Sequence, residues 1–109
     1  MKVRLKTAPG KPALQLMRDA GYAQYVSKHD DHVSYVRRVA GYEFPRFHVY
    51  VDESGALPTI SIHIDQKGVI YEGAAHAHNG EYTGPLIQEE LLRMRDAIGI
   101  QFIVLNSER

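Results

Sequence analysis

The sequence predicts an α+β fold, a single domain over residues 1–109 with a mainly antiparallel β-meander sheet and two helices packed on one face. Several short segments alternate apolar and polar residues and are joined by turns, which is typical of antiparallel strands. Two segments with helical periodicity begin near a proline and end at a glycine. A chain of 109 residues with 44% hydrophobic content has the size of one domain. The expected order of elements is β-α-β-β-β-β-α-β.

The first half of the chain supplies one helix and three strands before the central hairpin. Residues 2–6 alternate strictly, and their lysines are typical of an edge strand that avoids pairing with another chain. A short helix begins at Pro12 and ends at Gly21. Residues 22–26 and 33–39 follow as two strands, separated by a polar run that favours a turn.

The central hairpin is formed by residues 46–52 and 59–65, each of which alternates apolar and polar side chains. Pairing must keep both apolar rows on one face, because a slip of one residue would expose one row to water. Directly opposed Cβ atoms lie about 4.5–5.5 Å apart, so we expect two imidazoles to touch or to share a bound group and an arginine to pair with an aspartate. The expected cross-strand pairs are Tyr50 with Ser61, His48 with His63, and Arg46 with Asp65.

The last third of the chain carries a loop, the longest helix and a final strand. Residues 69–71 suggest a brief strand, and residues 73–84 are loop-like, with several glycines and no sustained period. The helix is expected to begin at Pro85 and to end at Gly99. The apolar residues 100–105 favour a strand in a central or well-covered position.

Composition excludes several classes of protein. The chain has no cysteine, which excludes disulfides and thiolate metal sites. No run of eighteen apolar residues suggests a membrane span, and no signal sequence is apparent, so we expect a cytoplasmic protein without a membrane partner. A pI near 7 argues against a dedicated nucleic-acid binder, which is usually strongly basic.

Histidines suggest a metal site. His76 and His78 are spaced by one residue and point the same way in an extended segment. Together with His48 and His63 they would form a site for a divalent metal, zinc or manganese, held by neutral imidazoles. Glu81, or a nearby aspartate, would supply an oxygen ligand or a general base.

Catalysis without a metal, or no catalysis at all, is also compatible with these residues. The candidate catalytic residues are His48, His63 and Glu81, and the two histidines would work as general acid and base while an arginine stabilises a phosphate. Alternatively, the histidines are neutral hydrogen-bonding side chains of a polar sheet face, and Arg46 and Asp65 form a modest surface ion pair. Whether the protein is an enzyme is left open by the sequence.

Four segments, PRFHVYV, IHIDQK, YEG and AHNGEYTGP, are similar to a group of short bacterial proteins that pair a PRFH segment with a DQK turn and an AHxGEY loop. The resemblance covers residues 35–95, and no activity is assigned to that group. It implies a shared site rather than a role. The residues of that site are Arg46, His48, His63, Asp65, Gln66, Lys67, His76, Gly80, Glu81 and Tyr82.

The expected function is that of a binding module, with its pocket where residues 73–84 approach the face that carries His48 and His63. The ligand would be an anionic small molecule, a peptide or a nucleic-acid backbone. The alternative is a small hydrolase or nuclease, metal-assisted or using histidine acid–base chemistry. Oligomerisation through edge strands is also expected. The predicted ligand-binding residues are Arg46, Tyr50, Asp65, Lys67 and Tyr82.

Overall fold

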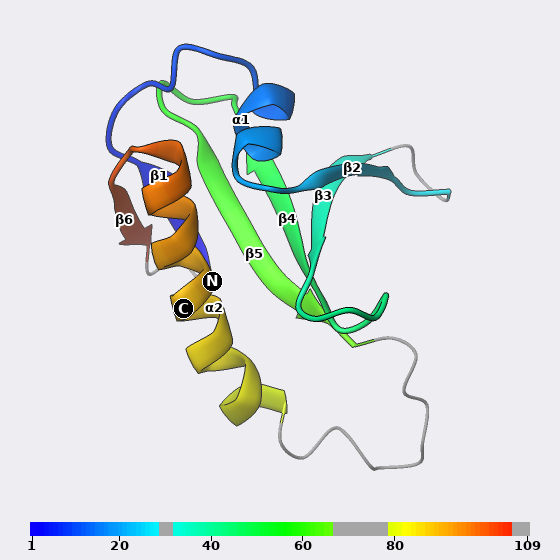
Figure 1. The fold of residues 1–109 in the computed structure, drawn as a ribbon. Helices are drawn as coiled ribbons and strands as arrows, with labels where there is room; N and C mark the ends of the chain where they lie inside the picture. The colour runs from blue at the N-terminus through cyan, green and yellow to red at the C-terminus, as the bar shows by residue number, and fades with distance from the viewer. Residues whose placement is uncertain (29–31, 67–78, 106–109) are drawn as a thin grey trace.

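Six strands form one antiparallel sheet in the order β2-β3-β4-β5-β1-β6, as Figure 1 shows. The computed structural model describes residues 1–28, 32–66 and 79–105, and for residues 79–83 it describes the backbone alone. The α+β class and the predicted order of elements are confirmed. The elements are β1 (Lys2–Leu5), α1 (Ala13–Asp19), β2 (Ala23–Val26), β3 (Val33–Arg38), β4 (Arg46–Asp52), β5 (Thr59–Asp65), α2 (Asn79–Ile98) and β6 (Phe102–Leu105).

The β4–β5 hairpin has the predicted bounds and the predicted register. His48 pairs with His63 and Arg46 pairs with Asp65. The register follows from the side-chain period of two, because it places the valines of β4 and the isoleucines of β5 on one face of the sheet. The polar residues of both strands therefore share the opposite face.

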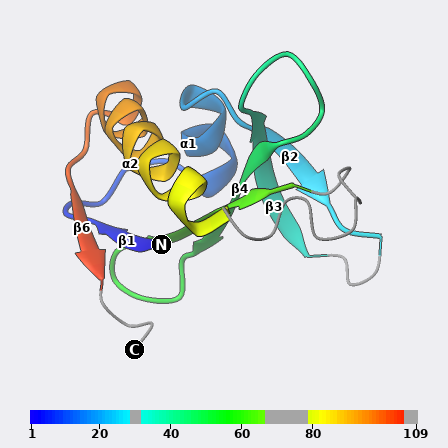
Figure 2. The ribbon, with the colours of Figure 1, turned by 90° about the horizontal axis from the view of Figure 1, so that it is seen from below.

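Both helices cover the same face of the sheet, which Figure 2 shows from below with α1 and α2 on one side. The core lies between this face and the helices. Burying one such aliphatic side chain contributes about 1.5–3 kcal/mol relative to leaving it in water. The largest side chains that are fully buried are Leu5, Leu16, Met17, Ile60, Ile62, Met94, Val3 and Val49.

Glu90 fastens α2 to the sheet. Its carboxylate is 3% exposed and accepts a hydrogen bond of 2.7 Å from the hydroxyl of Tyr22. It also accepts from Arg37 of β3 at 3.1 Å and from Arg93 of α2 at 2.9 and 2.8 Å. Burial, followed by the charge and hydrogen bond of Glu90, raises the pKa of Tyr22, so this hydroxyl remains a donor. The cluster ties α2 to β3 through Arg37, and no helix of the described residues lies on the other face of the sheet.

Two predicted strand positions were wrong. β1 is not an edge strand, because it pairs with β5 on one side and with β6 on the other. The apolar C-terminal strand, β6, is an edge strand instead, and Val104 on it is 58% exposed. Alternation reports which face of a strand is buried and not which strands flank it, so the cations of β1 occupy the uncovered face of an interior strand. The edges relevant to oligomerisation are therefore β2 and β6, and oligomerisation stays a prediction.

The predicted start of the long helix was also wrong. The helix begins at Asn79, and Pro85 lies inside it. Inside a helix, a proline removes one backbone hydrogen bond and its ring crowds the carbonyl four residues earlier, which is why the sequence favoured Pro85 as the first residue of the helix. The predicted end is correct, since Gly99 adopts a positive φ of 82° directly after Ile98. Within the described residues no helix combines the length and apolar character required to cross a membrane.

Candidate functional site

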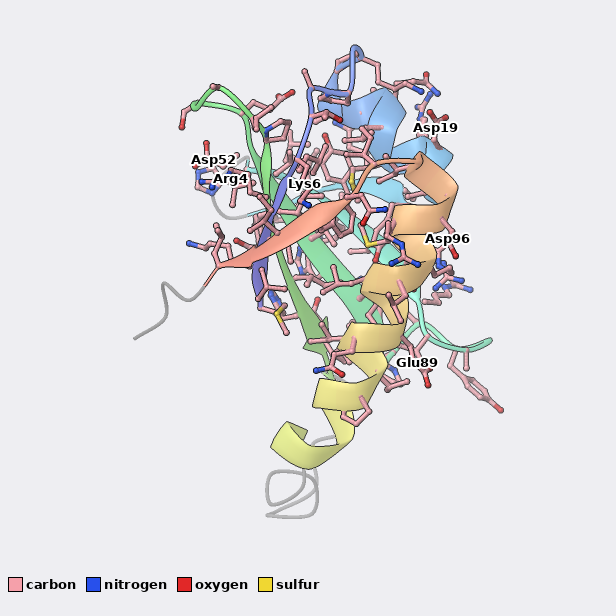
Figure 3. The ribbon with its side chains drawn as sticks, turned by 90° about the vertical axis from the view of Figure 1, so that its left-hand side faces the viewer. Arg4, Lys6, Asp19, Asp52, Glu89 and Asp96 are labelled. Carbon is pink, nitrogen blue, oxygen red and sulfur yellow. The ribbon has the colours of Figure 1, made fainter. Side chains whose placement is uncertain are left out.

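The candidate site lies on the open face, the name used here for the face of the sheet away from α1 and α2. Cross-strand pairing brings its central polar side chains from β3, β4 and β5 together. Figure 3 shows Arg4 and Asp52 on this side of the sheet, whereas Glu89 and Asp96 lie on the side of α2. The centre of the open face is polar because the apolar rows of β4 and β5 point to the helices.

Asp65 is the shared acceptor of the open face. Its Oδ2 accepts hydrogen bonds from Arg46 Nε at 3.1 Å and from His48 Nδ1 at 2.8 Å. Its Oδ1 accepts from His63 Nε2 at 3.0 Å. Burial by itself raises the pKa of this carboxyl, but the hydrogen bond from Arg46 and the two imidazoles outweigh burial and hold the pKa below its ordinary value. The predicted pairing of Arg46 with Asp65 is confirmed, and the two histidines share Asp65 as their bound group.

His48 is held at both ring nitrogens and is 7% exposed. Because an ionised carboxylate only accepts, His48 Nδ1 carries the proton that bonds to Asp65. In the neutral ring Nε2 then accepts from the hydroxyl of Ser34 at 2.7 Å. Ser34 Oγ also lies 3.3 Å from the carbonyl oxygen of Tyr25, so the hydroxyl has a second acceptor when the imidazole is protonated. The ring is thus fully satisfied in both protonation states.

Ser34, His48 and Asp65 follow the atom order of a serine hydrolase triad, from hydroxyl to imidazole to carboxylate. Two observations argue against a nucleophilic serine. Ser34 is 2% exposed, which leaves little room for a substrate carbonyl. It also lies inside a strand, where backbone N–H groups pair with neighbouring strands and are not free to form an oxyanion hole. Ser34 is therefore a residue that positions His48.

Arg46 lies between two aromatic rings. Its Cζ is 4.9 Å from the ring centroid of Tyr25 and 4.5 Å from that of Phe44, which are cation–π distances. Directly opposite Arg46 on β3 is Arg38. Among the described residues, Arg46 is ion-paired with Asp65, whereas the Arg38 side chain forms no ion pair with a carboxylate; Glu43 lines the pocket that both arginines border. Cross-strand pairs of like charge destabilise a sheet unless an anion joins them.

Three rings form a cluster between the central strands. The rings of His48 and Tyr50 are stacked, with centroids 4.8 Å apart and an interplanar angle of 18°. The ring of His63 lies 5.1 Å from that of His48 and 6.0 Å from that of Tyr50. Tyr50 is 41% exposed and the side chain of His63 is 51% exposed, so the cluster has an accessible surface.

A pocket of about 260 Å³ opens over these residues. Sequence analysis did not place four of its residues, Tyr25, Ser27, His32 and Ser34, in the site, because they belong to β2, to β3 and to the segment between them. His32 was considered only as a possible metal ligand within its own turn. The available signal was the alternation of apolar and polar residues in 22–26 and 33–39. Alternation shows which side chains of a strand share a face, but it does not show that these strands lie beside the hairpin. The lining residues are Tyr25, Ser27, His32, Ser34, Arg46, His48, Tyr50, His63 and Asp65.

A metal ion could be held by His48, His63 and Asp65, whose ligand atoms lie within 4.8 Å of one another. Two imidazoles and a carboxylate are a suitable set for a divalent transition metal and leave positions open for other ligands. Of the predicted metal ligands, His48 and His63 come together as expected. His76, His78 and Lys67 lie outside the described residues, as do the side chains of Glu81 and Tyr82 and the strand predicted for residues 69–71. Of the loop predicted for residues 73–84, residues 73–78 lie outside them too, whereas residues 79–84 belong to α2, so the loop prediction was wrong there.

Comparisons of the chain with protein-family models, with curated proteins and with solved structures found no match. The resemblance based on PRFH, DQK and AHxGEY therefore stays a prediction. The fold and the side-chain geometry carry the functional argument.

Acid should expose the contribution of Asp65 to stability. The pKa of Asp65 is lower in the folded chain than in the unfolded chain. Below about pH 4 the unfolded chain therefore binds more protons than the folded chain, and the free energy of unfolding decreases as the pH is lowered. Asp65→Asn should lower the free energy of unfolding at pH 7 by about 1–3 kcal/mol, because donors lose their ionised acceptor. It should also flatten the loss of stability between about pH 4 and pH 2. Urea unfolding at a series of pH values measures both effects.

The matched control for this prediction is Asp96→Asn, at an exposed position on the side of α2. This variant should keep the acid dependence of the parent chain. Parallel curves for the parent and Asp65→Asn would contradict the assigned role of the carboxylate.

Proposed function

We propose that the protein is a binding module whose open face takes an anionic, phosphate-bearing ligand. The observation that carries this proposal is the cross-strand pair of Arg38 and Arg46. Asp65 already accepts from Arg46 and from two histidines, so it does not offset the second guanidinium. A phosphate bridging the two arginines would relieve their repulsion with charge-assisted hydrogen bonds.

The position of Arg46 supports this assignment. Its Nε is bonded to Asp65 and its guanidinium is held between Tyr25 and Phe44, which fixes the side chain before a ligand arrives. Preorganisation of this kind lowers the entropic cost of binding. Arg46 also lines a second pocket, of about 370 Å³, together with Arg38. The same guanidinium thus borders both the histidine pocket and the arginine pocket.

The charge of the open face supports an anionic ligand even though the whole chain is neutral. Within the strands described, this face carries four cationic side chains against two carboxylates. One carboxylate, Asp65, is engaged by three donors. The other, Asp52, accepts from the backbone and the hydroxyl of Ser54, which hold its pKa below the ordinary value. The four cationic residues are Lys2, Arg4, Arg38 and Arg46.

Binding of inorganic tripolyphosphate tests this proposal. Arg46→Gln and Arg38→Gln should each weaken binding about 10-fold or more, because a hydrogen bond to a charged group contributes about 1.5–3 kcal/mol. Isothermal titration calorimetry at low salt measures the affinity. The matched control is Arg18→Gln, which removes an exposed arginine from α1, on the other side of the sheet. Equal affinity for all four proteins, or no binding to the parent chain, would contradict the proposal.

A second candidate is a metal-assisted hydrolase or nuclease, favoured by the convergence of His48, His63 and Asp65. Zinc or manganese at this position would present an activated water to a phosphate ester. The outer contacts suit such a role, since Ser34 would orient the ring of His48 and Arg46 would orient Asp65.

Metal binding separates this candidate from the binding module. On a chain without an affinity tag, the metal site predicts zinc or manganese bound at one ion per chain, and His63→Ala should abolish this binding. Asp52→Ala, which removes a carboxylate of the same face outside the cluster, should leave it unchanged. Inductively coupled plasma mass spectrometry after dialysis gives the stoichiometry. Tripolyphosphate binding that persists in excess chelator, with no metal retained, would reject the metal candidate and leave the binding module in place.

A further inference from the structure

The accessible rings of the open face point to the chemistry of the ligand beyond its phosphates. Tyr50 and His63 lie on adjacent strands, with ring centroids 6.0 Å apart and an interplanar angle of 24°. Both are among the more exposed side chains of the sheet, at 41% and 51%. A tyrosine exposed to this extent on a sheet face, with its ring held by a neighbour, presents a flat apolar surface to solvent. Such a surface suits the face of a planar ring.

The rings are held in place by the interactions beneath them. Tyr50 stacks on His48, which is itself bonded to Ser34 and Asp65. The ring of His63 is oriented by its bond to Asp65. Because these contacts restrict the side chains before binding, little conformational entropy remains to be lost when a ligand stacks on them. His48 thus supports an exposed platform, which is formed by the rings of Tyr50 and His63.

Cationic side chains flank this platform on two sides. Along β4, Arg46 is four residues from Tyr50, or about 13 Å. Across the sheet, Tyr50 and Lys2 both pair with Ser61, which places Lys2 two strands from Tyr50, or about 10 Å. A chain whose planar groups rest on Tyr50 and His63 would therefore meet positive charge on either side. Planar rings joined by a repeating anion are the chemistry of a nucleic-acid strand.

We propose that the ligand is a single-stranded nucleic acid, with bases stacked on Tyr50 and His63 and phosphates contacting Arg46, Arg38 and Lys2. This inference rests on the proposed function, since it specifies the phosphate-bearing ligand of the same face. Every base has a π-face, so stacking on aromatic side chains tolerates any sequence, and a basic surface beside the rings follows the backbone. A duplex keeps its bases stacked inside and cannot use the platform. The neutral composition of the whole chain does not oppose this, because the described strands place four cationic side chains and two carboxylates on this face.

Fluorescence anisotropy with labelled ten-nucleotide oligo(U) and oligo(dT) tests the inference. Tyr50→Leu should weaken binding roughly 5- to 150-fold, the effect expected for the loss of one base–aromatic stack. Tyr50→Phe should bind like the parent chain, because the ring rather than the hydroxyl makes the stack. The matched control is Tyr42→Leu, which removes a tyrosine that is 77% exposed but lies outside the strands. The two oligonucleotides distinguish RNA from DNA.

Salt dependence and competition separate this inference from the proposed function. Arg46→Gln should weaken binding of every sequence and reduce the slope of log affinity against log salt by about 1. The inference is overturned if tripolyphosphate displaces the labelled oligonucleotide as effectively as unlabelled oligonucleotide does and Tyr50→Leu leaves oligonucleotide affinity unchanged. In that case the phosphate-binding module still stands. Binding of a duplex as tight as that of the single strand would also overturn it. If neither tripolyphosphate nor oligonucleotide binds, both proposals fail.

Folding of the variants is checked independently of binding. The side chain of Tyr50 is 41% exposed and makes no hydrogen bond with a described residue, so Tyr50→Leu should keep the far-ultraviolet circular dichroism and the unfolding midpoint of Tyr50→Phe. If Tyr50→Leu is unfolded, His63→Ala tests the same platform from the neighbouring strand and should weaken oligonucleotide binding. The platform is rejected if folded His63→Ala binds the oligonucleotide as tightly as the parent chain does and Tyr50→Leu binds it as tightly as Tyr50→Phe does.

Discussion

A single carboxylate, Asp65, organises the open face of the sheet. It accepts hydrogen bonds from Arg46, His48 and His63, which belong to two paired strands. His48 supports the ring of Tyr50, and Arg46 lies between aromatic rings where it can face an anion. A half-buried carboxylate with three donors retains its charge, so the arrangement persists at neutral pH. The histidine pocket and the platform of Tyr50 and His63 both depend on Asp65, because it holds the side chains that form them.

The two faces of the sheet carry different side chains. The face under the helices buries the aliphatic rows, and Glu90 fastens α2 to it through Tyr22 and Arg37. No helix of the described residues covers the other face, so it can hold rings and charges at the surface without weakening the core. The core therefore lies on one side of the sheet and the candidate site on the other. The open face tolerates exposed aromatic side chains because the strands that carry them are fixed by the core on the opposite face.

The sequence predicted the centre of the site better than its surroundings. The period of two in β4 and β5 allows few registers, and the predicted one places His48 against His63 and Arg46 against Asp65 as observed. Ser34 was missed, because one serine in a strand gives no sign that its hydroxyl meets an imidazole from the next strand. The exchange of β1 and β6 was missed for a similar reason, since alternation describes faces and not neighbours. The start of α2 was missed because a proline is common at the first position of a helix, whereas Pro85 lies inside this one.

The tautomer of His48 tests the central role of Asp65 most directly. Long-range ¹H–¹⁵N correlation spectra of the uniformly labelled chain distinguish the two ring nitrogens. The account predicts that Nδ1 carries the proton donated to Asp65 and that Nε2 is the unprotonated acceptor of the Ser34 hydroxyl. A His48 ring protonated at Nε2, with Nδ1 bare, would mean that Asp65 does not hold it and would contradict the account.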